Sequence, residues 1–517
     1  MPTIREKILR QEISRLRDEL EGLRQEISRL QSASTSTSYH TSPDHDPTML
    51  RVKELYWTVT RIIGLSYLHD GSRCASVTTT DTVSARIGLR IKELYWTVTR
   101  FLGLSHLHDG SRRASVATTG GDQISSAPIE AVPPWDTTQT RLGKEILVVA
   151  NHLPLFDQAS GCLRLKSIIA ILGAAGWSIT FGSLMGLHHQ PGILATSEGR
   201  RRYEQTLAAV GVNGFLYGTE EIGGFLRDRG RCLDWVFLCF PDVAKQFIPL
   251  VRSRCPAARI AYDMVDFHAL RILREAELRA DSELHAKATQ QRAEEIACAL
   301  AADVTFAVSE NEKAALLELA PTAVVEVLTN VFEVPTSSIP GPHRRRGLLF
   351  VGGFWHTPNG DAVHWFAERI FPSIRDAVPD VTFSIAGANP DAEVLALGSR
   401  PGIEVLGYVP DLTSVFDSHR VFVAPLRYGA GMIGKVGQSM SLGLPVVTTP
   451  IGAEGMKLNN QTQVLIASDE QAFAAQVLRL LSDDELWLRL SVAGRKHIER
   501  TLSVDVVRSR LEAVIDG

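Results

Sequence analysis

The 517-residue sequence has few cysteines, no long apolar run and no excess of basic residues. Its six cysteines form no CxxC pair and no ligand-like cluster, which argues against a disulfide framework or a zinc site and fits a reducing cytoplasm. We find no run of 18 apolar residues for a membrane span, and the charged N-terminus lacks the apolar core of a signal peptide. A formal net charge of −4 gives no sign of the basic surface that nucleic-acid-binding proteins have. We therefore expect a cytoplasmic protein, for which attachment to the inner face of the cell membrane stays open.

The first 31 residues carry an apolar heptad pattern, and RQEISRL occurs in them twice, two heptads apart. The apolar positions, spaced alternately by four and three, are Leu9, Ile13, Leu16, Leu20, Leu23, Ile27 and Leu30. The pattern predicts a coiled coil over 1–31, favoured as a parallel homodimer. The alternative is a lone amphipathic helix that packs on its own protein. Residues 32–49 are rich in Ser, Thr, His, Asp and Pro, and this composition predicts a linker.

An internal duplication follows over 50–119. The 30-residue segments that start at Arg51 and Arg90 are identical at 24 positions and predict paired amphipathic helices. These helices would dock a partner or a membrane surface through Tyr and Trp, and the sequence does not choose between the two. The His-Asp pairs at 69–70 and 108–109 resemble metal ligands, but the Gly that follows each pair favours a turn. Residues 120–143 predict a second linker.

Alternating apolar strands and helical segments occupy the rest of the chain, which indicates parallel, doubly wound sheets. Two Rossmann-like domains are expected at 144–335 and 347–500, separated by a Pro/Arg-rich linker at 336–346. The final segment, 501–517, predicts a helix that crosses back to the first domain. In open α/β sheets ligands bind beyond the carboxyl ends of the strands, so the cleft between the two domains is the expected site.

One stretch of the second domain, Ala424 to Met456, predicts a strand, a Gly-rich loop, a helix and a second strand. Gly429 and Gly431 allow a tight loop that delivers backbone N–H groups to the start of a helix, where an anion binds well. Lys435 lies in the first turn of that helix, where a cation is disfavoured unless an anion offsets the helix dipole. The pattern therefore suggests an anion site, with a plain tight turn and a solvated lysine as the alternative.

Residues 144–517 resemble the group 1 glycosyltransferases (family 4 in the carbohydrate-enzyme classification) of bacterial type, with the two-domain GT-B fold. The resemblance rests on LLFVGGFWHTPNGDAVHWF, GYVPDL, APLRYGAGMIGKVGQSMSLGLPVVTTPIGAEGM and the tail GRKHIERTLSVDVVRSRLEAV, together with ARIAYDMVDFHALRILREAEL in the first domain. It implies a retaining, metal-independent hexosyltransferase. Such an enzyme moves a sugar from a nucleotide-sugar to a glycan, lipid-linked or surface-polysaccharide acceptor, and it needs no cofactor.

The resemblance also implies site residues. His268 and Lys435 are the expected catalytic residues. The donor-binding residues that it implies are Gly352, Gly353, Tyr408, Val409, Arg427, Gly429, Ala430, Gly431, Gln438 and Ser439. On the acceptor side, the loop after the first strand suggests Asp157, Ser160 and Gly161, and Asp266 follows a later strand. Asp266 also fits the cap of a helix that starts at Phe267.

The sequence departs from the pattern of the family in the donor region. Ala430 and Gln438 stand where a Glu-x7-Glu pair is usual, while Ile433 and Gly353 stand where many members have cations. The arginines at 344–346 would compensate for the missing cations, or they belong to a solvated linker. Glu454 is either a cleft residue or a turn carboxylate. Two other functions stay open: a different GT-B sugar-nucleotide enzyme such as an epimerase, or a catalytically weakened donor-binding subunit assembled through the coiled coil.

Overall fold

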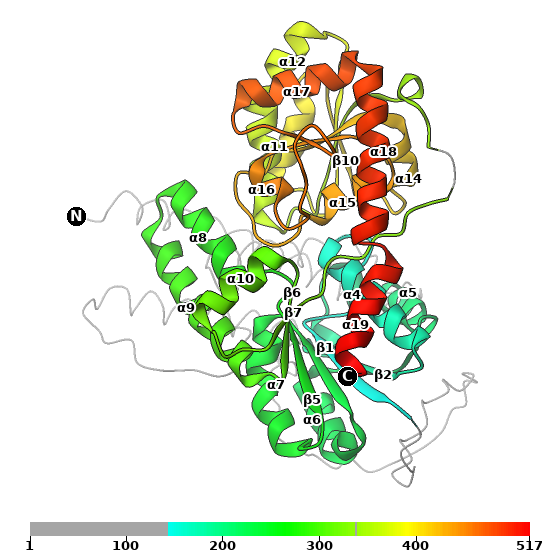
Figure 1. The fold of residues 1–517 in the computed structure, drawn as a ribbon, viewed down its shortest axis with the longest axis vertical. Helices are drawn as coiled ribbons and strands as arrows, with labels where there is room; N and C mark the ends of the chain where they lie inside the picture. Colours follow the sequence, from blue (N-terminus) through cyan, green and yellow to red (C-terminus); the bar gives the residue numbers. More distant parts are fainter. Residues whose placement is uncertain (1–142, 337–338) are drawn as a thin grey trace, which may run out of the picture. The chain divides into compact units, whose positions relative to one another are not determined.

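The computed structural model describes residues 143–336 and 339–517. The predictions for the coiled coil at 1–31, the repeat at 50–119 with its His-Asp pairs, and the linkers at 32–49 and 120–142 lie outside the described residues. They stay predictions. The described part contains two helix-covered parallel sheets (Figure 1).

The first sheet has seven strands in the order β3-β2-β1-β4-β5-β6-β7, and every recorded pairing is parallel. Its strands are β1 (Glu145–Ala150), β2 (Ser178–Ser183), β3 (Val212–Tyr217), β4 (Trp235–Cys239), β5 (Arg259–Asp263), β6 (Val304–Ala307) and β7 (Val325–Val327). Its helices are α4 (Ser160–Ala174), α5 (Ser197–Ala208), α6 (Gly218–Arg229), α7 (Pro241–Arg254), α8 (His268–Arg279), α9 (Ser282–Ala301) and α10 (Glu310–Leu319). The strand alternation predicted from the sequence is thus present.

Alternate residues of β1 explain why this sheet is covered on both faces. Ile146 and Val148 pack into one core with α4 and α5, whereas Leu147 and Val149 pack into another with α6, α7 and α10. Successive side chains of a strand point to opposite faces. A continuous apolar run therefore requires apolar cover on both sides, and the βαβ crossovers supply it.

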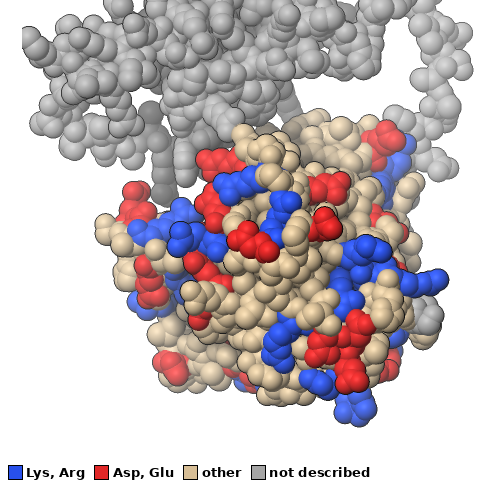
Figure 2. All heavy atoms as spheres, turned by 90° about the horizontal axis from the view of Figure 1, so that it is seen from above, with Lys and Arg blue, Asp and Glu red and all other residues tan. Residues whose placement is uncertain are grey.

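The second sheet has six parallel strands in the order β10-β9-β8-β11-β12-β13. Its strands are β8 (Arg346–Val351), β9 (Phe383–Ala386), β10 (Ile403–Gly407), β11 (His419–Ala424), β12 (Val446–Thr448) and β13 (Leu465–Ile466). Its helices are α11 (Thr357–Trp365), α12 (Phe371–Ala377), α13 (Ala392–Ala396), α14 (Thr413–Ser418), α15 (Gly434–Ser441), α16 (Pro450–Ala453), α17 (Glu470–Ser482) and α18 (Asp484–Thr501). On the face seen in Figure 2, Lys and Arg are interspersed with Asp and Glu.

Several elements are locally irregular. The charged stretch after β5 forms two helices, α8 and α9, which separate at Ala280, a residue with a φ of 51°. Asp281 then caps α9 by accepting from two backbone N–H groups. Between α11 and α12 the chain makes a π-helical turn, Phe366–Ile370. Helix α6 was not predicted, because its sequence GTEEIGGFLRDR contains three glycines.

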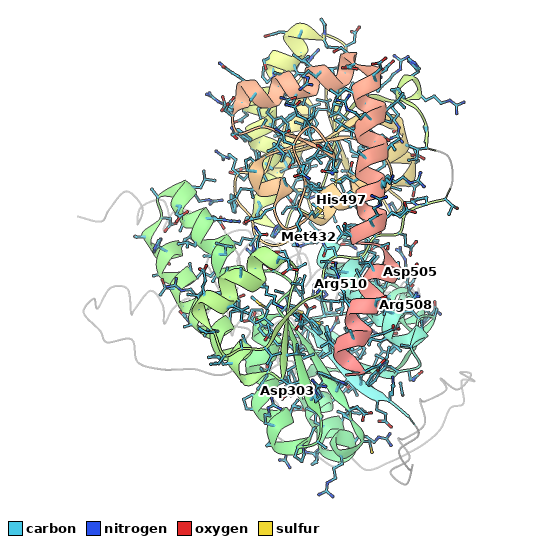
Figure 3. The ribbon with its side chains drawn as sticks, viewed as in Figure 1. Asp303, Met432, His497, Asp505, Arg508 and Arg510 are labelled. Carbon is cyan, nitrogen blue, oxygen red and sulfur yellow. The ribbon has the colours of Figure 1, made fainter. Side chains whose placement is uncertain are left out.

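The chain ends in a helix that packs on the first sheet. This helix, α19 (Val504–Ile515), places Val507, Leu511 and Ile515 in the same core as α4. Trp235 Nε1 donates to the Ile515 carbonyl at 3.2 Å. Figure 3 shows Asp505 and Arg508 on α19, where they form an exposed ion pair of 3.1 Å. A helix that follows the second domain in sequence is therefore part of the core of the first.

Candidate active site

Both sheets reverse their strand order beside their first strand. β1 lies between β2 and β4, and β8 lies between β9 and β11. Ligands of open α/β sheets bind beyond the strand ends at such a switch point. The loops at these ends meet. A Cβ on Gly434 would lie 2.4 Å from Ser160 Cβ, and a Cβ on Gly431 would lie 3.2 Å from Asp266 Cβ. The expected ligand edges of the two domains therefore face each other.

Lys435 lies in the first turn of α15, beside the switch point of the second sheet. Its ammonium group donates to Asn359 Oδ1 and lies 4.4 Å from the centre of the Phe350 ring. No carboxylate among the described residues lies within ion-pair distance of it. Desolvation lowers the pKa of Lys435 to about 7. A cation that is desolvated and has no ion-pair partner at a helix N-terminus is suited to an anionic ligand.

The loop after β8 encloses Lys435. A Cβ on Gly352 would lie 2.8 Å from the Asn359 amide and 2.9 Å from Lys435 Nζ, so a side chain there would displace both groups. Asn359 is buried and also donates to the Gly353 carbonyl at 2.7 Å, which fixes the amide that faces Lys435. At Gly353, a Cβ would meet the Trp355 ring at 2.6 Å. The two glycines thus allow the loop after β8 to lie close to Asn359, Lys435 and Trp355.

His268 and Asp266 lie across from this loop, in the first domain. His268 Nε2 is 3.2 Å from Asp266 Oδ1, and His268 Nδ1 is 3.2 Å from Glu295 Oε1. Burial favours the neutral imidazole, but Asp266 and Glu295 outweigh it and raise the pKa of His268. Burial also opposes ionisation of Asp266, yet His268 and Arg271 hold its pKa below its ordinary value. Both ring nitrogens of His268 therefore face acceptors, and the imidazolium form is favoured.

Asp266 does not cap the helix that follows it. The first backbone N–H groups of α8 bind two buried carboxylates from other helices. Phe267 N donates to Glu312 Oε1 at 2.8 Å, while His268 N and Ala269 N donate to Glu295 at 3.0 and 2.9 Å. Asp266 instead accepts from Arg271 Nε at 2.9 Å. The interpretation of Asp266 as the helix cap was wrong, because Glu295 and Glu312 supply the acceptors. Glu295 lies 27 positions from His268, and Glu312 lies 45 positions from Phe267.

Two non-glycine residues with positive φ lie at this edge. Phe240, after β4, has a φ of 76°, and Val265, after β5, has a φ of 66°. The left-handed region is unfavourable for bulky and β-branched residues, and such strain concentrates at functional sites. The Phe240 ring lies 6.1 Å from the His268 ring, edge to face. The strained backbone therefore borders the His268–Asp266 pair.

His356 joins the two sides of the site. It precedes α11 in the same loop as Gly352. Burial lowers its pKa to about 4, and the neighbouring charges of Arg271, Asp266 and Lys435 act on it as well. His356 is therefore neutral at pH 7 and provides one donor and one acceptor. The sequence analysis did not single out His356 or Asn359, although both belong to the loop FWHTPNG.

An ion pair between the domains holds the Gly-rich loop. Arg274 of α8 binds both carboxylate oxygens of Glu454, at 2.7 and 3.0 Å. The same guanidinium donates to the Gly429 carbonyl at 2.7 Å. Glu454 therefore lies in the cleft, as one of the two sequence interpretations had it. The bidentate pair fixes the loop from Gly429 to Gly431 against the first domain.

Asp157 and Tyr408 also meet between the domains. The Tyr408 hydroxyl donates to Asp157 Oδ2 at 2.7 Å. Asp157 further accepts from Tyr203 at 2.6 Å and from Arg202 at 2.9 Å. Asp157 therefore accepts from three donors. The structure thus brings together a residue expected on the acceptor side and one expected on the donor side, and the contact between them closes the cleft.

Other predicted site residues have partners within the protein. Arg427 pairs with Asp361 and lies 5.8 Å from the centre of the Trp365 ring. Ser439 is fully buried and donates to the Leu444 carbonyl at 2.9 Å, so its hydroxyl closes the end of α15 and is not offered to a ligand. Arg345 is neither a solvated residue nor a second phosphate cation. Its buried side chain donates to the Phe416 carbonyl at 2.5 Å and to Asp417 at 3.3 Å.

The remaining predicted residues lie around the same edge. Ala430, Gln438 and Val409 are partly buried, in the Gly-rich loop, on α15 and after β10. Gly161 approaches Val265, since a Cβ on it would lie 3.2 Å from a methyl group of that residue. A further glycine, missed from the sequence, is Gly437, where a Cβ would meet the Phe332 ring at 2.4 Å. Gly434 and Gly437 together let α15 pack directly on Ser160 and Phe332 of the first domain.

The comparisons with known proteins agree with this geometry. Residues 345–483 match the model of the group 1 glycosyl transferases. The matched segment runs from the start of the second sheet to the end of α17 and contains Gly352, Asn359 and Lys435. It covers less than a third of the chain.

Two curated relatives and one solved structure show how far the similarity extends. An uncharacterised 44.6 kDa protein of the Klebsiella pneumoniae cps region is 27% identical over 139 residues, which are 25% of this chain and 36% of that protein. A capsular polysaccharide biosynthesis glycosyltransferase of Staphylococcus aureus is 28% identical over 127 residues, which are 24% and 33%. The matches thus span about a third of the length of these relatives. The Anabaena protein HepE, solved in complex with UDP, covers 72% of this chain and all of its own, at 12% identity and a TM-score of 0.53.

The structural similarity establishes the fold. The two Rossmann-like sheets are those of the GT-B fold, as expected from the resemblance. Within 143–336 and 339–517, no helix is long and apolar enough to cross a membrane. The same residues contain no group of three or more His, Cys, Asp or Glu side chains arranged to hold a metal ion.

Proposed function

We propose that this protein is a glycosyltransferase that moves a sugar from a nucleotide-sugar to a glycan or lipid-linked acceptor, with retention of configuration. The observation that carries the proposal is Lys435, a desolvated cation with no carboxylate partner in the described structure, at the start of α15 beside Gly352. The leaving group of such a transfer is a nucleoside diphosphate, and fixed cations and N–H dipoles stabilise the charge that develops on it.

Each residue has a role in this proposal. Lys435 binds the diphosphate, and backbone N–H groups of the loop from Gly429 to Gly431 donate to it as well. His268, held as an imidazolium by Asp266 and Glu295, faces this loop from the first domain and stabilises negative charge on the departing phosphate. In a front-face substitution, the bond between the anomeric carbon and the phosphate oxygen breaks, and the acceptor oxygen forms its bond to that carbon from the same face. The phosphate oxygen takes the proton of the acceptor hydroxyl. The protein contributes orientation and electrostatics.

The substrate class is supported by the curated relatives and by the fold neighbour. The Staphylococcus aureus relative is named for capsular polysaccharide biosynthesis, and the Anabaena structure contains UDP. We infer a UDP-sugar or related donor and a surface-polysaccharide acceptor. The reaction would take place in the cytoplasm or at the inner face of the cell membrane, without a cofactor or a catalytic metal. A homodimer through the predicted coiled coil belongs to the same proposal.

A donor screen with the full-length protein tests the activity. Release of nucleoside diphosphate is measured for UDP-glucose, UDP-N-acetylglucosamine, GDP-mannose and dTDP-rhamnose, with and without polysaccharide acceptors. We expect one donor to be turned over, and Lys435→Met to lower kcat/KM by about 100-fold or more. Lys496→Met removes an exposed lysine of α18 that has no ion pair with a described residue and serves as the control. Nucleotide binding without turnover across all donors would favour a donor-binding subunit.

A further inference from the structure

The Gly-rich loop begins with a tyrosine that none of the roles above uses. Tyr428 directly precedes Gly429, and its side chain is fully buried. Its hydroxyl donates to Glu275 Oε1 of α8 at 3.3 Å, across 153 positions of the chain. Burial raises the pKa of Tyr428, against the opposing effects of Thr357 and Arg279, so the hydroxyl keeps its proton at pH 7 and acts as the donor. A side chain of the second domain is thus hydrogen-bonded to a helix of the first.

Glu275 is a buried carboxylate at this contact between the domains. It is 8% exposed, and Arg279, one turn further along α8, pairs with the same oxygen at 3.0 Å. This oxygen therefore meets one donor from each domain, since Tyr428 belongs to the second. A carboxylate loses hydration on burial, so an apolar side chain would pack here more favourably. The acidic group is better explained by the geometry that its hydrogen bonds impose than by packing.

Helix α8 connects this contact to His268. His268 is the first residue of α8, and Glu275 lies seven positions later. Seven residues are close to two helical turns, so the two side chains leave the same face of the helix, about 10 Å apart along its axis. The start of the helix is fixed within the first domain, because Glu295 and Glu312 accept its first backbone N–H groups. A residue of the second domain that is bound to Glu275 therefore keeps a set distance from His268.

Successive residues of the Gly-rich loop follow α8 toward its N-terminus. The Gly429 carbonyl accepts from Arg274 at 2.7 Å. A Cβ on Gly431 would lie 3.2 Å from the Cβ of Asp266, whose carboxylate pairs with His268. The tyrosine contact is thus one end of an interface whose other end lies beside the imidazole.

We propose that Tyr428 and Glu275 are positioning residues for the transfer reaction, because their hydrogen bond sets the distance between His268 and the Gly-rich loop. The inference rests on the proposed function, in which His268 stabilises charge on the departing phosphate. Neither positioning residue is assigned a contact with the substrate. Lys435 belongs to the same domain as Tyr428, so loss of the bond moves His268 away from the phosphate and leaves the phosphate on its cation. The chemical step is therefore affected, and the affinity for the nucleotide is not.

Kinetics of the full-length protein test the proposal. Release of nucleoside diphosphate is followed for the donor that the protein turns over, and calorimetry gives the affinity for that nucleoside diphosphate. Tyr428→Phe removes the hydroxyl and keeps the ring. We expect kcat to fall about tenfold while the affinity stays within about threefold, because a small misplacement of a charged group slows the chemical step alone. Tyr217→Phe removes a tyrosine–glutamate hydrogen bond to Glu204 inside the first domain, and it should keep the kcat of the wild type.

Substitutions of Glu275 and His268 separate positioning from a purely structural role. Glu275→Gln keeps an oxygen that accepts from Tyr428, so kcat should stay within about threefold of the wild type. Glu275→Leu should lower kcat as Tyr428→Phe does, and the two changes together should lower it no further. In His268→Ala protein, Tyr428→Phe should change kcat by less than about twofold, because the group that is positioned is gone. A structural contact would instead give its full loss in that background.

The outcomes that would overturn the inference are distinct from a failure of the proposed function. An unaltered kcat in Tyr428→Phe, an affinity that falls as much as kcat, equal losses in Glu275→Gln and Glu275→Leu, or a full effect of Tyr428→Phe in His268→Ala protein would each overturn it. If Tyr428→Phe does not fold, the comparison of Glu275→Gln with Glu275→Leu decides the question alone. A wild-type protein that turns over no donor overturns the proposed function and the inference together, whereas turnover that is indifferent to these substitutions overturns the inference alone.

Discussion

At the residue scale, the account depends on one cation and on what surrounds it. Lys435 is desolvated, donates to a neutral amide and has no carboxylate partner among the described residues. Most lysines that leave solvent gain a carboxylate, because an unpaired buried charge is costly. The neutral partner here, Asn359, leaves the positive charge available to a ligand.

Replacing that neutral partner with an anion tests this reasoning. Asn359→Asp would place a carboxylate against Lys435 Nζ, raise the pKa of the lysine and repel a diphosphate. We expect affinity for UDP, measured by calorimetry, to fall about tenfold or more, equivalent to about 1.4 kcal/mol. Asn213→Asp, on the exposed part of β3, serves as the control. Unchanged affinity in Asn359→Asp would mean that the diphosphate binds elsewhere.

At the scale of elements, a buried ion pair joins α4 to β5. Arg164 donates to both oxygens of Asp263 at 2.6 and 3.0 Å and to the Leu328 carbonyl at 2.7 Å. Both side chains are 1% exposed. Removing one partner leaves the other charge buried and uncompensated. We expect Asp263→Asn to lower the free energy of unfolding by about 3–5 kcal/mol in urea denaturation. Asp505→Asn breaks the exposed pair with Arg508 and should lower the free energy of unfolding by less than about 1 kcal/mol. Equal losses of stability in Asp263→Asn and Asp505→Asn would contradict the account.

The packing of α15 depends on its glycines. A Cβ on Gly434 would lie 2.4 Å from Ser160 Cβ, whereas a Cβ on Gly360 of α11 would meet nothing within 4 Å. Gly434→Ala should therefore push α15 away from α4 and lower the Tm. Gly360→Ala should raise stability by about 0.5–1 kcal/mol, because alanine loses less conformational entropy in a helix. Thermal unfolding of the two variants in parallel measures the difference. An unchanged Tm in Gly434→Ala would mean that the domains do not contact each other here in solution.

At the scale of the whole described structure, polar contacts between the domains hold the cleft closed. Three of them are Arg274 with Glu454 and Gly429, Tyr408 with Asp157, and the Asn330 amide with the Met432 carbonyl at 3.2 Å. Figure 3 labels Met432 where the two domains meet. All three contacts involve loops at the carboxyl ends of the strands, so opening the cleft would expose the site to substrates.

Amide hydrogen exchange can follow this closure. Arg274→Ala removes the clamp on the Gly-rich loop, so we expect the amides of 429–431 to exchange at least about tenfold faster. Arg292→Ala, an exposed change on α9 with no ion pair to a described residue, should leave these rates unaltered. Protection that is the same in both variants would show that the bidentate pair does not hold the loop.

The sequence predicted the strands and helices around the site, because buried apolar runs and glycine-rich turns are local signals. It also predicted Lys435 at the start of a helix and Gly352 in the facing loop. It did not predict which carboxylates cap α8, since Glu295 and Glu312 are 27 and 45 residues away from their partners. Nor did it predict the Arg274–Glu454 pair, separated by 180 residues. Such partners are set by how the two sheets face each other, which no local pattern contains.

The pH dependence of nucleotide binding tests the central claim most directly. Desolvation lowers the pKa of Lys435 to about 7 in the free protein, and a bound diphosphate should return it toward its ordinary value. Binding therefore takes up a proton above pH 7. Calorimetry with UDP, GDP and dTDP from pH 6 to 9 should show affinity that is level below pH 7 and falls by up to about tenfold per unit above it. Lys435→Met should bind weakly at every pH, and Lys496→Met should behave as the wild type. If none of the three nucleotides binds, or if Lys435→Met binds with the affinity of the wild type, the account is wrong.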